Sequence, residues 1–310
     1  MGTSIYTHAA CLDHRPGPHH PESPQRLEAV LQALDSAEFA STQRCEAPRG
    51  TREQVLLAHS EAYFDAVEAA VPQQGYRALD GGDTILSSGS WEAALRCVGA
   101  ACAAVDGVVE GGSRNAFCAT RPCGHHAESE RAMGFCIFNQ AAIAALHARA
   151  AHGLRRVAVV DFDVHHGNGT QNRFYDDPDL FYGSSHQSPF YPGTGARAES
   201  GIAGNIVNIP LPEGCDSATF RRHMRTQMLP ALREFAPELL VISAGFDAHH
   251  LDPLGGLAFT DDDFHWITCE LMAVADDCAH GRVVSTLEGG YSLQGLASAT
   301  AAHVRALMQA

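Results

Sequence analysis

Three short, almost continuously apolar segments limit what this chain can fold into. They cover residues 156–162, 239–246 and 283–287, and each is rich in Val, Ile or Leu. A strand that is apolar on both faces is typical of a buried parallel sheet. We therefore expect a parallel sheet that contains all three segments.

Helical patterns alternate with these segments. Apolar residues recur at helical spacing over residues 90–110, 140–152, 219–235, 261–278 and 293–308, which predicts helices covering both faces of the sheet. Residues 14–24 and 184–204 are expected to be long loops. No repeat or linker divides the chain. The prediction is one α/β domain, residues 1–310, with a central, mostly parallel sheet and a site in loops at the carboxyl ends of its strands.

Composition excludes some classes of function. The formal net charge is −15 and no basic cluster is present, so direct nucleic-acid binding is not expected. No run approaches the length of a membrane span. The ten cysteines include no C-x-x-C pair, so a structural zinc site is not expected. Since the first residues also carry no signal-peptide pattern, we predict a cytoplasmic protein.

Polar side chains follow the first apolar segment. Asp161, Asp163 and His165 alternate with Phe162 and Val164. In an extended chain, the three polar side chains therefore point to one side. Ligands bind beyond the carboxyl ends of parallel strands, so we expect a metal site here.

A third carboxylate, Asp247, follows the second apolar segment in the same way. Two aspartates and one histidine leave the fourth position of Zn²⁺ open, as in a catalytic site. The alternative is that each Asp caps a following helix or turn, which is a common role.

Two further motifs carry groups suited to proton transfer and carbonyl activation. His125 and His126 are adjacent in a Gly-containing loop, and imidazole exchanges protons near neutral pH. Tyr291 follows the third apolar segment and the pair Gly289-Gly290. The glycines permit a tight turn that presents the phenol to a pocket.

Taken together, these motifs resemble the histone deacetylase family, in its class II branch and among the bacterial histone deacetylase-like amidohydrolases. The resemblance runs from residue 20 nearly to the end of the chain. It also rests on three other stretches: His20-Pro21-Glu22-Ser23-Pro24-Gln25-Arg26, Gly134-Phe135-Cys136-Ile137-Phe138-Asn139 and Asp252-Pro253-Leu254-Gly255-Gly256.

The resemblance implies an arginase/deacetylase-like fold and zinc-dependent hydrolysis of the acetyl amide of acetyllysine in proteins or peptides, with Fe²⁺ as an alternative metal. In the family mechanism, a metal-activated water attacks the amide and acetate is released. The implied roles are zinc ligation by Asp163, His165 and Asp247, proton transfer by His125 and His126, oxyanion stabilisation by Tyr291, and orientation of the two histidines by Asp161 and Asn168. Because Asn168 is neutral, we expect His126 to be the more available base.

Other positions receive expectations from the same resemblance. A structural K⁺ would use Asp161, Asp163, His165, Ser184 and Ser185. Phe135 and Tyr191 match the walls of the acyl channel. Glu288 is expected to fix a turn, and His249 and His250 are expected to be rim or loop residues rather than zinc ligands.

The substrate remains open at this stage. An acetylpolyamine amidohydrolase uses the same machinery, but Leu254 stands where polyamine-preferring relatives have an acidic gatekeeper, which favours acetyllysine. Arginase-type chemistry would need more bridging carboxylates beside His165. A catalytically silent protein that binds acyl groups is a third reading, against which His126 and Tyr291 argue. The sequence does not determine the oligomeric state.

Overall fold

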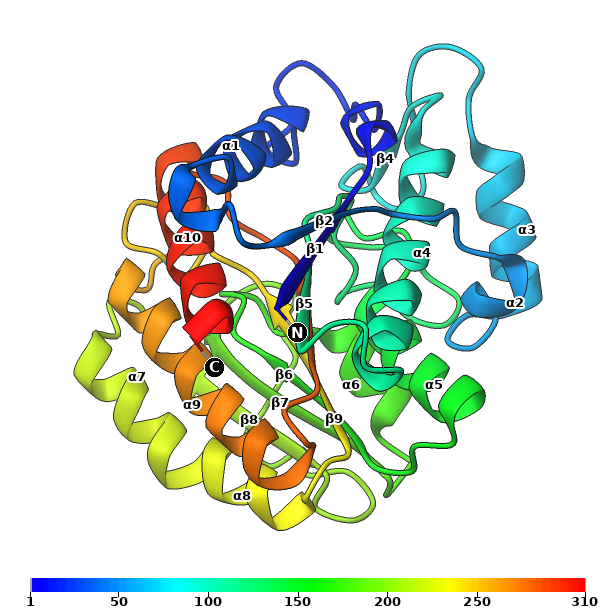
Figure 1. Cartoon of the computed structure of the whole chain (residues 1–310). Helices are drawn as coiled ribbons and strands as arrows, with labels where there is room; N and C mark the ends of the chain where they lie inside the picture. The colour runs from blue at the N-terminus through cyan, green and yellow to red at the C-terminus, as the bar shows by residue number, and fades with distance from the viewer. Residues whose placement is uncertain (1, 310) are drawn as a thin grey trace.

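The computed structural model describes residues 2–309, and its centre is an eight-stranded parallel sheet (Figure 1). The strand order is β2-β1-β5-β10-β9-β6-β7-β8. The strands are β1 (Thr3–Thr7), β2 (Gln43–Glu46), β5 (Asn115–Cys118), β6 (Val157–Asp161), β7 (Leu180–Gln187), β8 (Ile206–Leu211), β9 (Leu239–Ala244) and β10 (Val283–Leu287). A small antiparallel pair, β3 (Arg77–Ala78) and β4 (Ile85–Leu86), lies outside the main sheet.

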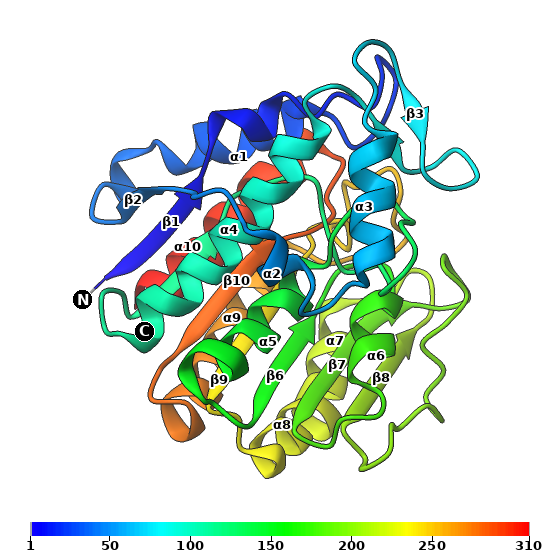
Figure 2. The same ribbon diagram turned by 90° about the vertical axis from the view of Figure 1, so that its right-hand side faces the viewer.

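Helices cover both faces of the sheet (Figures 1 and 2). One face carries α1 (Pro24–Leu34), α7 (Ser217–His223), α8 (Leu229–Phe235), α9 (Asp261–Cys278) and α10 (Leu293–Gln309). The other carries α4 (Ser90–Val109), α5 (Gln140–His152) and α6 (Asn168–Phe174). The remaining helical segments are α2 (Arg52–Val55), α3 (Glu61–Ala70), the short turns Ala9–Leu12 and Ala37–Phe39, and a π-helical turn, Met224–Met228, that joins α7 to α8.

Each face of the sheet has its own apolar core. In β9, Ile242 packs with residues from α1, α9 and α10, whereas the preceding Val241 packs with residues from α4 and α5. Both side chains are fully buried. The central strands are therefore apolar on both sides, which is the pattern seen in their sequence.

The predicted α/β architecture is confirmed, and the three predicted strands correspond to β6, β9 and β10 within two residues at each end. One expectation was wrong. Residues 184–187 belong to β7 rather than to a loop, because β6 and β8 pair with this strand on its two sides. The long connection before β8 therefore begins at Ser188, after the strand ends.

Local signals fix the ends of several helices. The Asn139 side chain accepts a hydrogen bond from the Ala142 amide at the start of α5, and Gly153 ends that helix with a φ of 68°. A capping side chain at the start of a helix and a left-handed glycine at its end are both common. Within residues 2–309, no helix combines the length and apolar character needed to cross a bilayer.

Candidate active site

Four neighbouring strands in the middle of the sheet, β5, β10, β9 and β6, end at the same edge. The chain beyond β5 carries the His125-His126 pair, and the chain beyond β10 carries Tyr291. Asp247 follows β9, and the Asp-His segment, residues 161–165, lies at the end of β6. Parallel strands thus bring together groups that are up to 166 positions apart in the sequence.

Asp163, His165 and Asp247 converge on one point. His165 Nδ1 lies 3.0 Å from Asp163 Oδ1 and 3.2 Å from Asp247 Oδ2. Each carboxylate is held by the backbone, because Gly289 N donates to Asp163 Oδ2 and Val164 N donates to Asp247 Oδ1, both at 2.8 Å. One imidazole and two carboxylate oxygens therefore face one another in a fixed arrangement.

This group has the properties of an incomplete metal site. Asp247 Oδ2 is buried, and in the described part of the chain it accepts no well-formed hydrogen bond, although His165 Nδ1 lies 3.2 Å away. A buried carboxylate oxygen without a well-formed hydrogen bond is costly. Burial, together with the neighbouring charge of Asp163, raises the pKa of Asp247 to about 7. A cation bound between the carboxylates would remove both penalties, so the residues present fit a divalent metal.

The two adjacent histidines have different partners. His125 Nδ1 lies 2.9 Å from Asp161 Oδ2, and His126 Nδ1 lies 2.8 Å from Asn168 Oδ1. The Asn168 amide nitrogen donates to Glu128 at 2.8 Å, so its oxygen faces His126 and accepts the Nδ1 proton. This leaves Nε2 of His126 as the unprotonated nitrogen.

The pKa values of His125 and His126 are shifted in opposite directions. Burial alone would lower the pKa of His125, but the carboxylates of Asp161 and Asp163 raise it well above its ordinary value. Burial lowers the pKa of His126 well below its ordinary value, and the charges of His125 and His165 lower it further. These directions favour a neutral His126 beside a charged His125. The role of His126 as the base stays a prediction.

Tyr291 is held by two residues from distant segments. Its backbone amide and that of Ser292 donate to Asp252 Oδ2 at 2.6 and 3.0 Å. The Arg26 guanidinium lies over the phenol ring, 4.9 Å from its centroid. Burial raises the pKa of Tyr291 well above its ordinary value, so the hydroxyl keeps its proton and can donate it in a hydrogen bond.

Sequence reasoning underrated Glu288 and Arg26. Glu288 Oε2 accepts hydrogen bonds from Gly124 N at 2.7 Å and His125 N at 3.2 Å, so it orients the loop of the histidine pair as well as its own turn. Arg26 donates to the carbonyls of Gly290 and Glu288. The signal in the sequence was a charged residue, Arg26, at helical spacing from the apolar residues Val30 and Leu34, which places it on the apolar face of α1.

A cavity of about 160 Å³ leads to this group. Two predicted channel residues, Phe135 and Tyr191, line it, and so does Leu254 at its mouth. His126, His165 and Tyr291 lie in its wall, and Asp83, which was not predicted, is also part of the lining. The cavity is narrow and mostly apolar, which suits an extended alkyl chain.

Four other residues were named in the predictions: Ser184, Ser185, His249 and His250. Ser184 pairs with Asp161 in the β6–β7 register, and the neighbouring Ser185 hydroxyl is buried with no hydrogen-bond partner among residues 2–309. His250 is exposed, and both His249 and His250 lie in the loop between β9 and α9, within the expectation of rim or loop residues. His249 is 3% exposed, because it packs on Phe264 and pairs with an aspartate at the start of α9.

Comparisons with known proteins identify the family. The family model of the histone deacetylase domain matches residues 20–307. Histone deacetylase 14, chloroplastic, of Arabidopsis thaliana is 38% identical over 98% of this chain and 76% of its own length. The histone deacetylase-like amidohydrolase of Pseudomonas aeruginosa is 36% identical over 94% of this chain and 82% of its own.

A solved structure shows the same fold. The crystal structure of the HDA15 HD domain superposes with a TM-score of 0.92 at 33% identity, covering 100% of this chain and 89% of that one. The family is generally metal-dependent, and its members' names describe hydrolases that act on amides. The chain belongs to the histone deacetylase family and is a hydrolase of the deacetylase/amidohydrolase type.

Proposed function

We propose that the whole chain, residues 1–310, is one catalytic domain that hydrolyses the acetyl amide of acetyllysine in proteins or peptides with the help of one Zn²⁺. The observation that carries this proposal is Asp247 Oδ2, which is buried without a well-formed hydrogen bond beside His165, a residue that lines the cavity. The donor set of Asp163, His165 and Asp247, with an open fourth position, is typical of catalytic zinc. Fe²⁺ is an alternative occupant of the same ligands.

Asp163, His165 and Asp247 would hold the ion. Bound there, it would supply Lewis-acid polarisation of the acetyl carbonyl and activation of water. The chain supplies the remaining chemistry. His126 Nε2 is the base that takes a proton from the attacking water, because its Nδ1 proton is engaged by Asn168. Asp161 keeps His125 charged beside it.

The Tyr291 hydroxyl donates a hydrogen bond to the oxyanion that forms on the former carbonyl oxygen. Arg26 lies over the ring of Tyr291, and Asp252 accepts a hydrogen bond from its backbone amide. When the tetrahedral intermediate collapses, the amine leaves with a proton returned by the histidine pair, and acetate is the second product. No covalent acyl-enzyme is needed.

We extend the proposal to a structural K⁺ beside this site. Asp161 and Ser184 are cross-strand neighbours, and the buried Ser185 hydroxyl lacks a protein partner within residues 2–309. The ion would use these residues with backbone oxygens of Asp163 and His165. Oxygen ligands of this kind suit a hard cation.

For the substrate, we propose acyl-lysine rather than polyamine, following the class II pattern. Phe135 and Tyr191 offer aromatic walls for the lysine alkyl chain. Leu254 at the mouth is 36% exposed and carries no charge to hold a distal ammonium. We also place the protein in the cytoplasm, which its ten free thiols support.

The test is turnover by untagged protein after chelation and refilling with Zn²⁺ or Fe²⁺. We expect metal-dependent hydrolysis of acetyllysine and trifluoroacetyllysine peptides, with kcat/KM above that for acetylspermidine and acetylputrescine. Tyr291→Phe should lower kcat by about 10²–10³-fold, with KM little changed, because it removes one oxyanion donor.

Each other outcome would support a different hypothesis about the function. Higher kcat/KM for the acetylpolyamines would make the protein an acetylpolyamine amidohydrolase. Binding of acetyllysine peptide without turnover in any metal form would support the silent binder. Turnover that survives chelation would reject the metal-dependent mechanism.

A further inference from the structure

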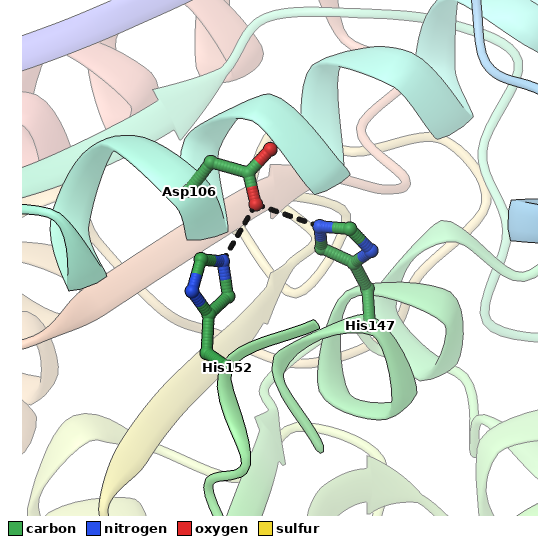
Figure 3. Close-up of side chains that lie close together, drawn as sticks. All are labelled: Asp106, His147 and His152. Carbon is green, nitrogen blue, oxygen red and sulfur yellow. Dashed lines mark hydrogen bonds and ion pairs between the residues drawn. The ribbon is translucent and has the colours of Figure 1, made fainter. Parts of the chain in front are cut away.

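A second group of metal-ligating side chains lies between α4 and α5, away from the active site. It consists of Asp106 on α4 with His147 and His152 on α5, and we name it the α4–α5 cluster (Figure 3). We propose that this cluster is a second metal site, which takes a divalent first-row transition ion such as Zn²⁺ and joins the two helices.

The three side chains converge on one point. Asp106 Oδ1 lies 2.7 Å from Nε2 of His147 and 2.7 Å from Nε2 of His152. One ligand atom from each residue lies within 4.8 Å of the others. The two rings are nearly perpendicular, at 86°, so they approach the carboxylate from different sides. Figure 3 shows both ring nitrogens directed at the same oxygen.

Little movement is needed to admit an ion. With zinc–ligand bonds of about 2.0–2.1 Å, ligand atoms of a tetrahedral site lie about 3.3 Å apart. The two nitrogen–oxygen separations therefore have to open by only about 0.6 Å. Asp106 is 41% exposed, so its carboxylate is reachable from solvent. Water would fill the fourth position.

The charge of Asp106 also favours a cation. In the described part of the chain, its side chain pairs with these two histidines and with no arginine. Its second oxygen accepts no hydrogen bond from residues 2–309. Imidazole and carboxylate are ligands that suit zinc, nickel and copper.

The simpler interpretation is a metal-free network in which both histidines donate Nε2–H to Asp106. Metal binding requires the other tautomer, with the proton on Nδ1. No residue in the range 2–309 accepts a hydrogen bond from either Nδ1, and neither atom is among the buried unpartnered ones. Both Nδ1 atoms therefore reach water, which can solvate the proton that the metal-binding tautomer places there.

The cluster lies at the opposite edge of the sheet from the active site. His152 ends α5, five positions before β6 begins, and β6 then runs toward Asp161. Asp106 likewise sits in the last turn of α4, which precedes β5. An ion there cannot touch the substrate. Its role is to hold α4 and α5 together, and α4 and α5 pack on the same face of the sheet (Figure 2).

The test counts metal by equilibrium dialysis of untagged protein against buffered Zn²⁺, with mass-spectrometric detection. Wild type is compared with His147→Gln/His152→Gln. Each glutamine keeps an N–H donor for Asp106 but offers no imidazole ligand, so the metal-free network survives and the metal site does not. The double variant should bind one equivalent of zinc less per chain than wild type and should keep wild-type deacylase activity.

Two further variants make the count specific. His19→Gln/His280→Asn removes two exposed histidines, and asparagine tolerates the φ of 55° at position 280. This control should bind as much zinc as wild type. Asp106→Asn removes the anionic ligand without altering α5, and it should also lose one equivalent.

Stability gives an independent readout. Zn²⁺ should raise the Tm of wild type more than that of the His147→Gln/His152→Gln protein, because a ligand that binds only the folded state stabilises it. Equal zinc content in wild type, the double histidine variant and Asp106→Asn would overturn the proposal. Because this comparison is a difference between variants, it does not depend on how the catalytic centre is filled.

Discussion

The guanidinium of Arg26 lies over the ring of Tyr291, 4.9 Å from its centroid, although the two residues are 265 positions apart. The same group donates from Nε to the Gly290 carbonyl at 2.6 Å and from Nη2 to the Glu288 carbonyl at 2.5 Å. Its third contact is Glu22 at 2.9 Å. One buried side chain on α1 therefore fixes the turn that presents the phenol.

Arg26→Lys should show whether the position of Tyr291 depends on the charge of Arg26 or on its hydrogen-bond geometry. An ammonium can still pair with Glu22 but cannot form the same planar fork of hydrogen bonds. We expect about a tenfold loss in kcat from displaced Tyr291, and about 1–3 kcal/mol loss in the free energy of unfolding from unsatisfied carbonyls. Steady-state kinetics and urea unfolding measure the two effects. The exposed Arg49→Lys should change neither, and wild-type kcat in Arg26→Lys would refute the positioning role.

Gly134 gives a second prediction about the site. Its φ is 55°, and a Cβ there would lie 2.4 Å from Cδ2 of His126. Gly134→Ala should displace that ring and lower kcat/KM by roughly 100-fold. Gly204 has a φ of 71° with open space around it. Gly204→Ala therefore imposes similar backbone strain without the clash and should retain activity, so equal losses in the two variants would mean that strain alone is responsible.

Leu254→Glu should change substrate preference. A carboxylate at the cavity mouth would attract the distal ammonium of an acetylated polyamine by about 1 kcal/mol at 4 Å in water. We therefore expect kcat/KM for acetylspermidine to rise about fivefold relative to Leu254→Gln, the neutral control of equal size. The gain should shrink as salt is added. No difference between the two variants would show that this position does not select substrates by charge.

His59 provides a pH-dependent stability prediction away from the site. Its Nε2 accepts a hydrogen bond from Asn139 N at 2.9 Å and its Nδ1 donates to the Glu128 carbonyl at 3.0 Å, so the folded state holds the neutral ring. Burial lowers the pKa of His59 to about 4. Because the folded-state pKa is below the unfolded value of about 6.5, the contribution of His59 is complete above pH ~6.5 and is lost as pH falls toward 4.

His59→Gln should flatten that dependence, since an amide can accept and donate at the same two places without titrating. We expect the wild-type free energy of unfolding to fall by about 1.4 kcal/mol per pH unit more than that of the variant between pH 6 and 4.5. Urea unfolding at four pH values provides the measurement. Parallel curves for the two proteins would show that His59 is not held neutral.

The sequence by itself determined the class of fold and named most of the residues that the structure brings together in the candidate site. Continuous apolar runs identified β6, β9 and β10, because a strand covered on both faces must be apolar on both faces. The polar residues that follow these runs were recognisable as candidate site residues because ligands bind beyond the carboxyl ends of parallel strands. The family motifs supplied the remaining assignments.

Only the tertiary structure decided which strands are neighbours and what satisfies the buried polar groups. The strand β5, with sequence NAFC, is too short and too polar to show as an apolar run. Its buried Asn115 donates from Nδ2 to the Leu307 carbonyl, a partner at the far end of the chain. In β7, Ser184 and Ser185 read as loop residues but are buried by pairing with β6 and β8. The α4–α5 cluster likewise joins residues 46 positions apart. Local patterns indicate burial where the buried residues are apolar, whereas the burial of polar residues and the identity of their partners depend on long-range packing that no short window of sequence contains.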